Sequence, residues 1–345
     1  MISSFSSRGT LRWKDWMTNH LRRREFFTLL GSAAAAWPIA VGAQQPAMPV
    51  VGYLDLGSPE ARANLVAAFR KGLSETGYVE GRNLAIEYRF AHSQFDRLPE
   101  LAADLVRHGV AVIVARPTQS ALAAKAATST IPIVFEIGGD PVKAGLVASL
   151  NRPGSNITGA ASLNVELGPK RLELLHEVVP AATTIAMLLD PVAGVEYQSI
   201  DMQAAARTLG VQLHILRTST ERDITMAFAT LAELRAGALV IGGGSFLLGR
   251  IELLTALTLR HAVPSISQDR DLTAAGGLMS YGGNLAESYR LAGVYTGRIL
   301  KGEKPSDLPV QQSTKVELII NMKTAKALGL TFPITLLGRA DEVIE

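Results

Sequence analysis

Three aspartates have the type and position to do chemistry, because each follows a segment that is expected to form a buried strand. Asp140, Asp190 and Asp269 come directly after apolar runs, and open α/β sheets place their binding groups at such strand ends. A carboxylate there could act as an acid or base, or it could hold an ammonium group. Asp140-Pro141 and Asp190-Pro191 are also typical of turns and helix N-caps, and no base or nucleophile stands beside any of the three. Ligand contact, acid–base catalysis and capping therefore remain open.

Other motifs for catalysis or cofactors are absent from the sequence. The nearest approach to a serine nucleophile elbow is GGGSF at 242–246, which lacks the glycine after the serine. The sequence has no phosphate-loop motif and no dinucleotide fingerprint after the first expected strand. It has no cysteine, and the histidines beyond residue 43 stand singly: His92, His108, His176, His214 and His261. We therefore expect no metal, no cofactor and no enzyme activity.

Residues 1–43 have the pattern of an export signal preceded by an upstream extension. Arg22, Arg23 and Arg24 precede an apolar run of about 15 residues that ends in the small residues Gly42 and Ala43. This run is shorter than the roughly 20 apolar residues of a transmembrane helix, and RREFF at 23–27 resembles the twin-arginine export motif. We expect cleavage near Ala43 and a periplasmic location. The alternative is a buried helix that opens a cytosolic domain.

Removal of this leader changes the charge of the chain. The whole sequence has 34 basic and 31 acidic residues, a net charge of +3, but six of the basic and two of the acidic residues lie in the leader. The remainder has 28 basic and 29 acidic residues and a net charge of −1. A near-neutral chain without a basic stripe lacks the positive surface that is typical of nucleic-acid binding. The lack of a cysteine after the cleavage site argues against a lipid anchor.

The remaining chain alternates between β-rich apolar runs and helical patterns, which is typical of parallel sheets with crossover helices. The expected strands are 50–56, 84–90, 110–115, 131–137, 184–189, 211–216, 238–241, 264–267, 277–281 and 316–321. The expected helices are 62–76, 98–107, 120–128, 142–150, 167–179, 197–209, 224–235, 248–261, 285–300 and 322–328. A cluster of turn formers at 151–156 divides the series. This pattern predicts an α/β protein with two doubly wound lobes and a cleft at the strand ends.

One long stretch resembles a known family. The sequence GDPVKAGLVASLNRPGSNITG at 139–159 is similar to the signature of a family of ABC transporter substrate-binding proteins that includes tryptophan/tyrosine-type members. KRLELL at 170–175, GLMSYG at 277–282, INMKTAKALGL at 320–330 and RADEVI at 339–344 also resemble it. The resemblance implies a type I periplasmic binding protein with two flavodoxin-like lobes and a three-segment hinge. The implied N-terminal lobe is 48–159 plus 283–308, and the implied C-terminal lobe is 160–282 plus 309–345.

The resemblance also implies ligand contacts in the strand-end loops of both lobes. The residues that match these positions are Ser58, Thr118, Gln119, Ser120, Asp140, Asp190, Tyr197, Ser245, Phe246, Asp269 and, at a crossing, Tyr281. Helix-start N–H groups would bind a carboxylate, an acidic side chain would bind an ammonium group, and aromatic rings would form walls. Phe246 and Tyr197 could equally belong to the core. Arg116 stands where amino-acid binders have a Gly-Thr-Pro loop, and it would suit an acidic ligand.

The implied function is that of a periplasmic solute receptor, monomeric and not anchored to the membrane. It would close on a small molecule, either an amino acid (aromatic in some members) or a small organic acid, and deliver it to an inner-membrane ABC permease. Two alternatives stay open. One is an exported α/β enzyme that uses Asp140, Asp190 or Asp269 as acid or base, and the other is a ligand-sensing subunit that docks on a membrane sensor kinase.

Overall fold

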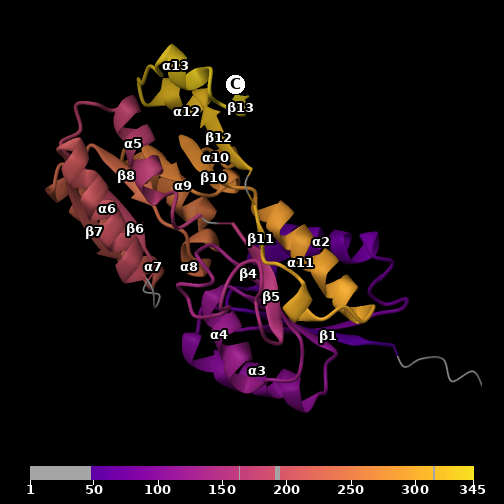
Figure 1. Cartoon of the computed structure of the whole chain (residues 1–345). Helices are drawn as coiled ribbons and strands as arrows, with labels where there is room; N and C mark the ends of the chain where they lie inside the picture. The colour runs from indigo at the N-terminus through magenta and orange to yellow at the C-terminus, as the bar shows by residue number, and fades with distance from the viewer. Residues whose placement is uncertain (1–47, 163, 191–194, 314) are drawn as a thin grey trace, which may run out of the picture. The chain divides into compact units, whose positions relative to one another are not determined.

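The computed structural model describes residues 48–162, 164–190, 195–313 and 315–345, so the predicted export signal at 1–43 lies outside the described residues. The described chain forms two sheets, each with helices on both faces (Figure 1). The predicted α/β class is confirmed. Within this part of the chain, no helix has the length and apolar character that a membrane span needs.

The first sheet has six parallel strands in the order β11-β5-β4-β3-β1-β2. Their bounds are β1 Val50–Asp55, β2 Ala85–Phe90, β3 Val112–Arg116, β4 Ile133–Ile137, β5 Ile157–Ala161 and β11 Gln311–Gln312. Helices α3 (Leu98–Arg107) and α4 (Thr118–Ala127) cover one face, whereas α2 (Pro59–Glu75) and α11 (Leu285–Leu300) cover the other. The inner strands β1, β3 and β4 are almost continuously apolar because helices bury both of their faces.

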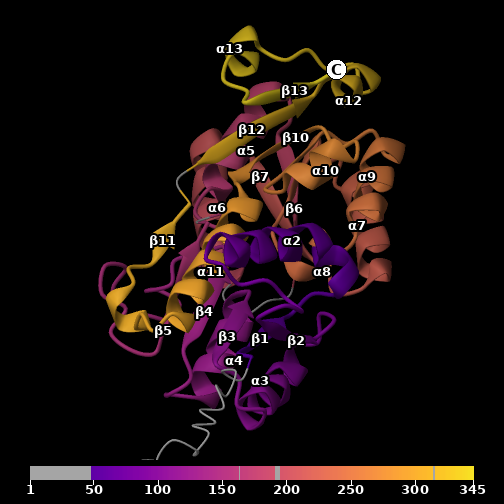
Figure 2. The ribbon, with the colours of Figure 1, turned by 90° about the vertical axis from the view of Figure 1, so that its right-hand side faces the viewer.

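Helix α11 lies beside α2 although the two are far apart in the sequence (Figures 1 and 2). Two glycines allow this close approach. A β-carbon at Gly72 would collide with the carbonyl oxygen of Arg290, and one at Gly293 would collide with that of Phe69. The helix backbones are therefore in direct contact, which returns a late segment of the chain to the first sheet.

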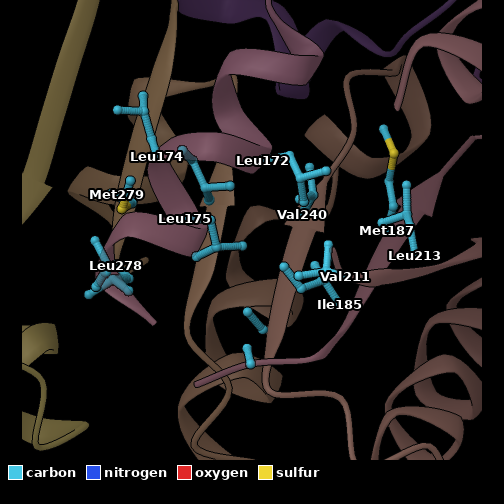
Figure 3. Close-up of a cluster of buried hydrophobic side chains, with 14 of the residues drawn as sticks. Leu172, Leu174, Leu175, Ile185, Met187, Val211, Leu213, Val240, Leu278 and Met279 are labelled. Atoms are coloured by element: carbon cyan, nitrogen blue, oxygen red, sulfur yellow. The ribbon is translucent and has the colours of Figure 1, made fainter. Parts of the chain in front are cut away.

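The second sheet has the order β13-β12-β10-β9-β8-β6-β7, and only the β10–β12 pair is antiparallel. The bounds are β6 Thr184–Leu189, β7 Gln212–Arg217, β8 Ala238–Ile241, β9 Ser265–Ser267, β10 Met279–Gly283, β12 Val316–Asn321 and β13 Glu342–Ile344. Leucines of α5 (Gly168–Val178) pack on one face of this sheet, over β8 and β9, and α6 (Val195–Leu209) covers the same face beside β7 (Figure 3). Helices α7 (Glu221–Glu233) and α9 (Ile251–Arg260) cover the other face. The remaining helices are short: η1 Phe95–Arg97, α8 Ser245–Leu248, α10 Arg270–Ala274, η2 Pro305–Asp307, α12 Met322–Ala327 and α13 Ile334–Leu337.

The chain passes between the two sheets three times, after β5, after β10 and after β11. The expected lobe boundaries followed residues 159 and 308. Strand β5 continues to Ala161, and Gln311 pairs with Ala160 of β5, so β11 lies with the first sheet. Backbone pairing decides this membership, and a two-residue strand with exposed side chains gives the sequence little signal of it.

Two expected helices differ from the structure. The segment 142–150 forms only turns, because Asp140 caps a single turn that ends at Gly145 with a positive φ of 71°. The helix expected over 248–261 is two helices, α8 and α9, which are separated by Gly249 and Arg250.

Candidate ligand-binding site

A buried group of charges lies at the carboxyl ends of the first-sheet strands. Arg116 ends β3, and its Nε donates to Oε2 of Glu136 at 3.1 Å while its Nη1 donates to Oδ2 of Asp55 at 3.4 Å. The guanidinium of Arg116 also lies over the ring of Tyr289, 4.6 Å from its centroid. Burial raises the pKa of Glu136, and the nearby Arg116 opposes this change. Two carboxylates of its own lobe therefore already pair with Arg116.

A second buried arginine, Arg62 in the first turn of α2, is part of the same strand edge. A β-carbon at Gly57 would stand 2.9 Å from Nε of Arg62, so the glycine makes room for this side chain. The amide of Gly57 donates to Oδ1 of Asp55 at 2.7 Å. The sequence analysis did not select Arg62, yet a signal exists: Arg62, Val66 and Phe69 follow the spacing of one buried helix face. An arginine in line with apolar residues on one helix face indicates that its guanidinium is buried with them.

On the second sheet, Asp190 follows β6 and anchors the start of α8. Its Oδ2 accepts from the amide of Phe246 at 2.8 Å, and its Oδ1 accepts from the amide of Leu247 at 3.2 Å. Gly244 is required beside it, because a β-carbon there would collide with the carboxylate. Burial raises the pKa of Asp190 to about 6, although the two amides and the positive charge of Arg62 act in the opposite direction. Arg62 belongs to the first sheet, so the two strand edges face each other here.

Asp269 lies just after β9, which is separated from β6 by β8 in the same sheet. Its Oδ1 accepts from the amide of Asp271 at 2.9 Å, which makes it the N-cap of α10. Burial raises the pKa of Asp269, and both Arg62 and Arg116 of the first sheet lower it. Asp190 and Asp269 therefore both face the arginines of the opposite strand edge, while both also hold helix starts.

A cavity of about 100 Å³ lies between the first-sheet lobe and the second-sheet lobe. Asn64 and Leu65 of α2 line it from one side, and Gln268, Asp269 and Ser280 line it from the other. Nearby, a β-carbon at Gly249 would stand 3.8 Å from Cβ of Ala61. The cavity is smaller than the roughly 300–1,000 Å³ of ordinary ligand pockets.

Four of the first-sheet candidates lie at helix starts beside this edge. Ser58 is the N-cap of α2 and accepts from the amide of Ala61 at 3.4 Å. Thr118, Gln119 and Ser120 form the first turn of α4. Ser120 is fully buried, and its hydroxyl has no hydrogen-bond partner among the described residues. Ser58 and Ser120 thus bring polar groups to the ends of β1 and β3.

The second-sheet candidates differ in their surroundings. Ser245 is the buried first residue of α8. The ring of Phe246 belongs to the core between the sheet and α9, with the guanidinium of Arg250 over it at 4.1 Å. Its backbone amide, rather than its ring, therefore meets Asp190. Tyr197 stands on α6, and its side chain lies outside the described residues.

Asp140 has a local task that the structure makes plain. Its Oδ1 accepts from the amides of Val142 at 2.8 Å and Lys143 at 3.2 Å, so it caps the turn after β4. Of the three strand-end aspartates, Asp190 and Asp269 lie close enough to Arg62 for its positive charge to lower their pKa. The Asp140 carboxylate makes the contacts of a turn cap, which the sequence analysis had kept as one of its alternatives.

Polar contacts join the first two crossings. The Oδ1 of Asn164, after β5, accepts from the amide of Gly283 at 2.6 Å. Arg171 of α5 is fully buried, and it donates to the carbonyl oxygens of Asn164 at 2.7 Å and Tyr281 at 3.1 Å. Burial lowers the pKa of Arg171 to about 10. The predicted site residue Tyr281 thus takes part, through its backbone carbonyl, in the contacts that join two crossings.

The structure offers few donors for a metal ion. Within residues 48–345, apart from the gaps at 163, 191–194 and 314, no three His, Asp or Glu side chains gather closely enough to hold one. The carboxylates that do come together are matched by arginines or by helix-start amides.

Two α/β lobes, joined by three crossings and facing each other through the carboxyl ends of their strands, define a hinged solute-binding protein. Comparison with known proteins gives the family: the chain belongs to the ABC transporter substrate binding proteins, whose family model matches residues 54–344. The family predicted from the sequence is therefore confirmed. The chain is 27% identical to a tyrosine-binding protein of Clostridioides difficile over 264 residues, which cover 76% of this chain and 75% of that protein.

Solved structures agree with the fold. A conserved domain protein of Vibrio cholerae is 26% identical, with a TM-score of 0.79, over 86% of this chain and 99% of that one. An ABC domain from Streptococcus pneumoniae in complex with L-Trp is 23% identical, with a TM-score of 0.77 and the same coverage. A ligand-free, open substrate-binding protein of Clostridioides difficile is 26% identical, with a TM-score of 0.61. The predicted type I periplasmic binding fold is confirmed.

Proposed function

We propose that this protein is the solute-binding component of an ABC import system. On this proposal the leader is removed near Ala43, and the mature monomer binds its solute in the periplasm and delivers it to an inner-membrane permease. One observation supports the proposal most directly. Arg62 of one lobe lowers the pKa of Asp190 and Asp269 of the other, and Ala61 beside it lies against Gly249, so polar groups of both lobes lie close together. Membership of the substrate-binding family supports the same conclusion.

The proposed solute is an amino acid or a small organic acid, with aromatic amino acids as the first candidates. The name of the Clostridioides difficile relative and the L-Trp bound to the Streptococcus pneumoniae structure support this choice. The proposed contacts are five of the predicted polar residues at the strand edges. Ser58 and Ser120 would meet the solute from the first lobe, and Asp190, Ser245 and Asp269 would meet it from the second. Helix-start amides and buried carboxylates of this kind suit the two ends of a zwitterion.

Solute capture would proceed by closure of the two lobes about the three crossings. The contacts of Asn164 and Arg171 hold the first two crossings at a fixed spacing, which suits a pivot. Closure follows only if the solute binds the closed arrangement more tightly than the open one. A permease would then recognise the paired surfaces of the closed lobes.

The contacts of the carboxylates speak against the enzyme alternative. Both oxygens of Asp190 accept backbone amides, and Asp269 and Asp140 cap a helix and a turn. A catalytic acid or base must instead present its proton to the substrate. The sensor alternative differs from the receptor in its docking partner and not in its cleft.

Calorimetry with the mature protein tests the proposal. The panel comprises L-tyrosine, L-tryptophan, other amino acids and benzoate, and the bound compound is recovered and identified after titration. Tight binding of an unaltered compound, with a smaller radius of gyration in X-ray scattering, is the expected result. Turnover of the compound would support the enzyme instead, and an unchanged radius at saturation would remove hinge closure. Solute-dependent stimulation of a permease ATPase encoded nearby would separate the import role from a sensor role.

A further inference from the structure

Arg62 is the charged side chain at the cleft whose hydrogen-bonding capacity is least used. It is 2% exposed, and its Nε and Nη2 have no hydrogen-bond partner among the described residues. A guanidinium carries five N–H donors and no acceptor. Leaving such donors buried and unpaired costs free energy, and the cost is larger for a charged group. The position of Arg62 therefore calls for an oxygen-rich partner.

The carboxylates around Arg62 are already engaged elsewhere. Asp55 receives the Gly57 amide and Arg116, Asp190 receives two amides of α8, and Asp269 receives the amide of Asp271. No carboxylate in the described part of the chain lies within 4.0 Å of a nitrogen of Arg62, whereas Arg116 has two such partners. The two arginines of this edge thus differ: Arg116 is matched within its own lobe, and Arg62 is not.

Arg62 also has the right location for contact with a solute. It stands in the first turn of α2, directly after Ala61, whose Cβ would lie 3.8 Å from a β-carbon at Gly249 of the other lobe. From the opposite lobe, Asp190 and Asp269 lie close enough for Arg62 to lower the pKa of both. Without Arg62, these two carboxylates would repel an incoming anion. The positive charge of Arg62 therefore favours the binding of a negatively charged group of the solute here.

We propose that Arg62 is a specificity-determining residue that binds the carboxylate of the solute when the lobes close. The assignment rests on the proposed function and deepens it, because it requires a solute with a carboxylate group. The planar guanidinium suits this partner, since its two parallel N–H groups match the two carboxylate oxygens. Lysine would keep the charge at this position but lose the paired geometry.

The experiment compares acids with their decarboxylated amines. Mature wild type, Arg62→Met and Arg62→Lys are titrated with L-tyrosine, tyramine, L-tryptophan and tryptamine. The matched control is Arg70→Met on the same helix, because Arg70 is exposed and pairs with Glu80 away from the cleft. Circular dichroism and melting temperature verify that each variant folds.

Removing one partner of a buried charge pair costs about 2 kcal/mol or more, so wild type should bind each acid at least about 30-fold more tightly than its amine. Arg62→Met should lose at least about 30-fold for the acids and leave the amines unchanged, with Arg62→Lys in between. Arg70→Met should match wild type. A purely structural role of Arg62 would instead weaken acids and amines alike.

Each other outcome overturns a different claim. If Arg62→Met binds the acids as wild type does, or loses acids and amines equally, the assignment of Arg62 fails while the solute receptor stands. If wild type prefers the amine to the acid, the carboxylate requirement fails in the same way. If wild type binds none of these probes and no other acid of the calorimetry panel, the proposed ligand class fails, and the assignment falls with it.

Discussion

Replacement of Asp190 by asparagine should remove a specific pH dependence from the stability of the protein. Burial raises the pKa of Asp190 from 3.8 to about 6 in the folded protein. At 1.36 kcal/mol for each pH unit, ionising this buried carboxyl costs the fold about 3 kcal/mol. Because the pKa of Asp190 is higher in the folded protein, its protonated carboxyl contributes its full stabilisation to the fold below pH 3.8. This contribution is lost as the pH rises to about 6. Most of the loss should therefore fall between pH 4 and 7.

Urea unfolding at a series of pH values measures this effect. All three tryptophans lie within residues 1–43, so the mature chain is followed by far-UV circular dichroism. The quantity of interest is the free energy of unfolding of wild type minus that of Asp190→Asn, which should fall by about 2–3 kcal/mol from pH 4 to 7.5. Asparagine cannot accept at both of its side-chain atoms, so it loses one amide contact of α8. That loss adds only a constant offset.

Asp223→Asn is the matched control. Asp223 is exposed, and hydrogen bonds from Ser219 and Thr220 lower its pKa to about 2. A lowered pKa gives stability that is present above 3.8 and lost at lower pH, so the wild-type-minus-variant difference should not fall in this window. A flat or rising difference for Asp190→Asn would refute the reasoning, because Asp190 would then not be buried as the structure has it.

Three further expectations concern packing, hinge and export. Gly293→Ala should destabilise the protein by about 1–3 kcal/mol in urea unfolding, because its methyl group would meet the carbonyl of Phe69; wild-type stability would contradict the α2–α11 contact. Arg171→Met should speed hydrogen exchange at the amide of Gly283 with little change in the α9 amides, and equal exchange in wild type and variant would contradict the pivot. Mass spectrometry of the exported protein should find Gln44 as its first residue, and a chain that keeps residues 1–43 would exclude the predicted cleavage.

Strands were the most predictable part of the fold. The inner strands of both sheets are short, mostly apolar runs, because burial on both faces favours apolar residues at nearly every position. The segment 142–150 has an equally helical pattern, but Asp140 caps only one turn, and the positive φ of Gly145 ends it. The local sequence pattern therefore predicted elements well where burial imposes that pattern. It predicted them poorly where a single turn contact decides whether a helix continues.

The site residues divide along a similar line. Strand-end position was enough to select Asp190 and Asp269, because parallel strands of one sheet end at a common edge. It did not select Arg62, which lies on helix α2, and it could not show that Arg116 is already paired. Arg116 is matched by Asp55 and Glu136, which come from two other strands. The sheet places the strands of Asp55 and Glu136 beside that of Arg116, so both carboxylates pair with Arg116. Neither of them pairs with Arg62.

The amino-acid sequence by itself determined the alternation of strands and helices, the family and the lack of cysteine-based or motif-based chemistry. These properties are local, because periodicity, turn formers and short motifs act within a few residues of chain. The tertiary structure alone decided that α11 packs on α2, that Asn164 and Arg171 tie two crossings together, and that Arg62 faces the carboxylates of the other lobe. Each of these contacts joins residues far apart in the chain, and their energies depend on burial and charge partners that exist only after both lobes have folded.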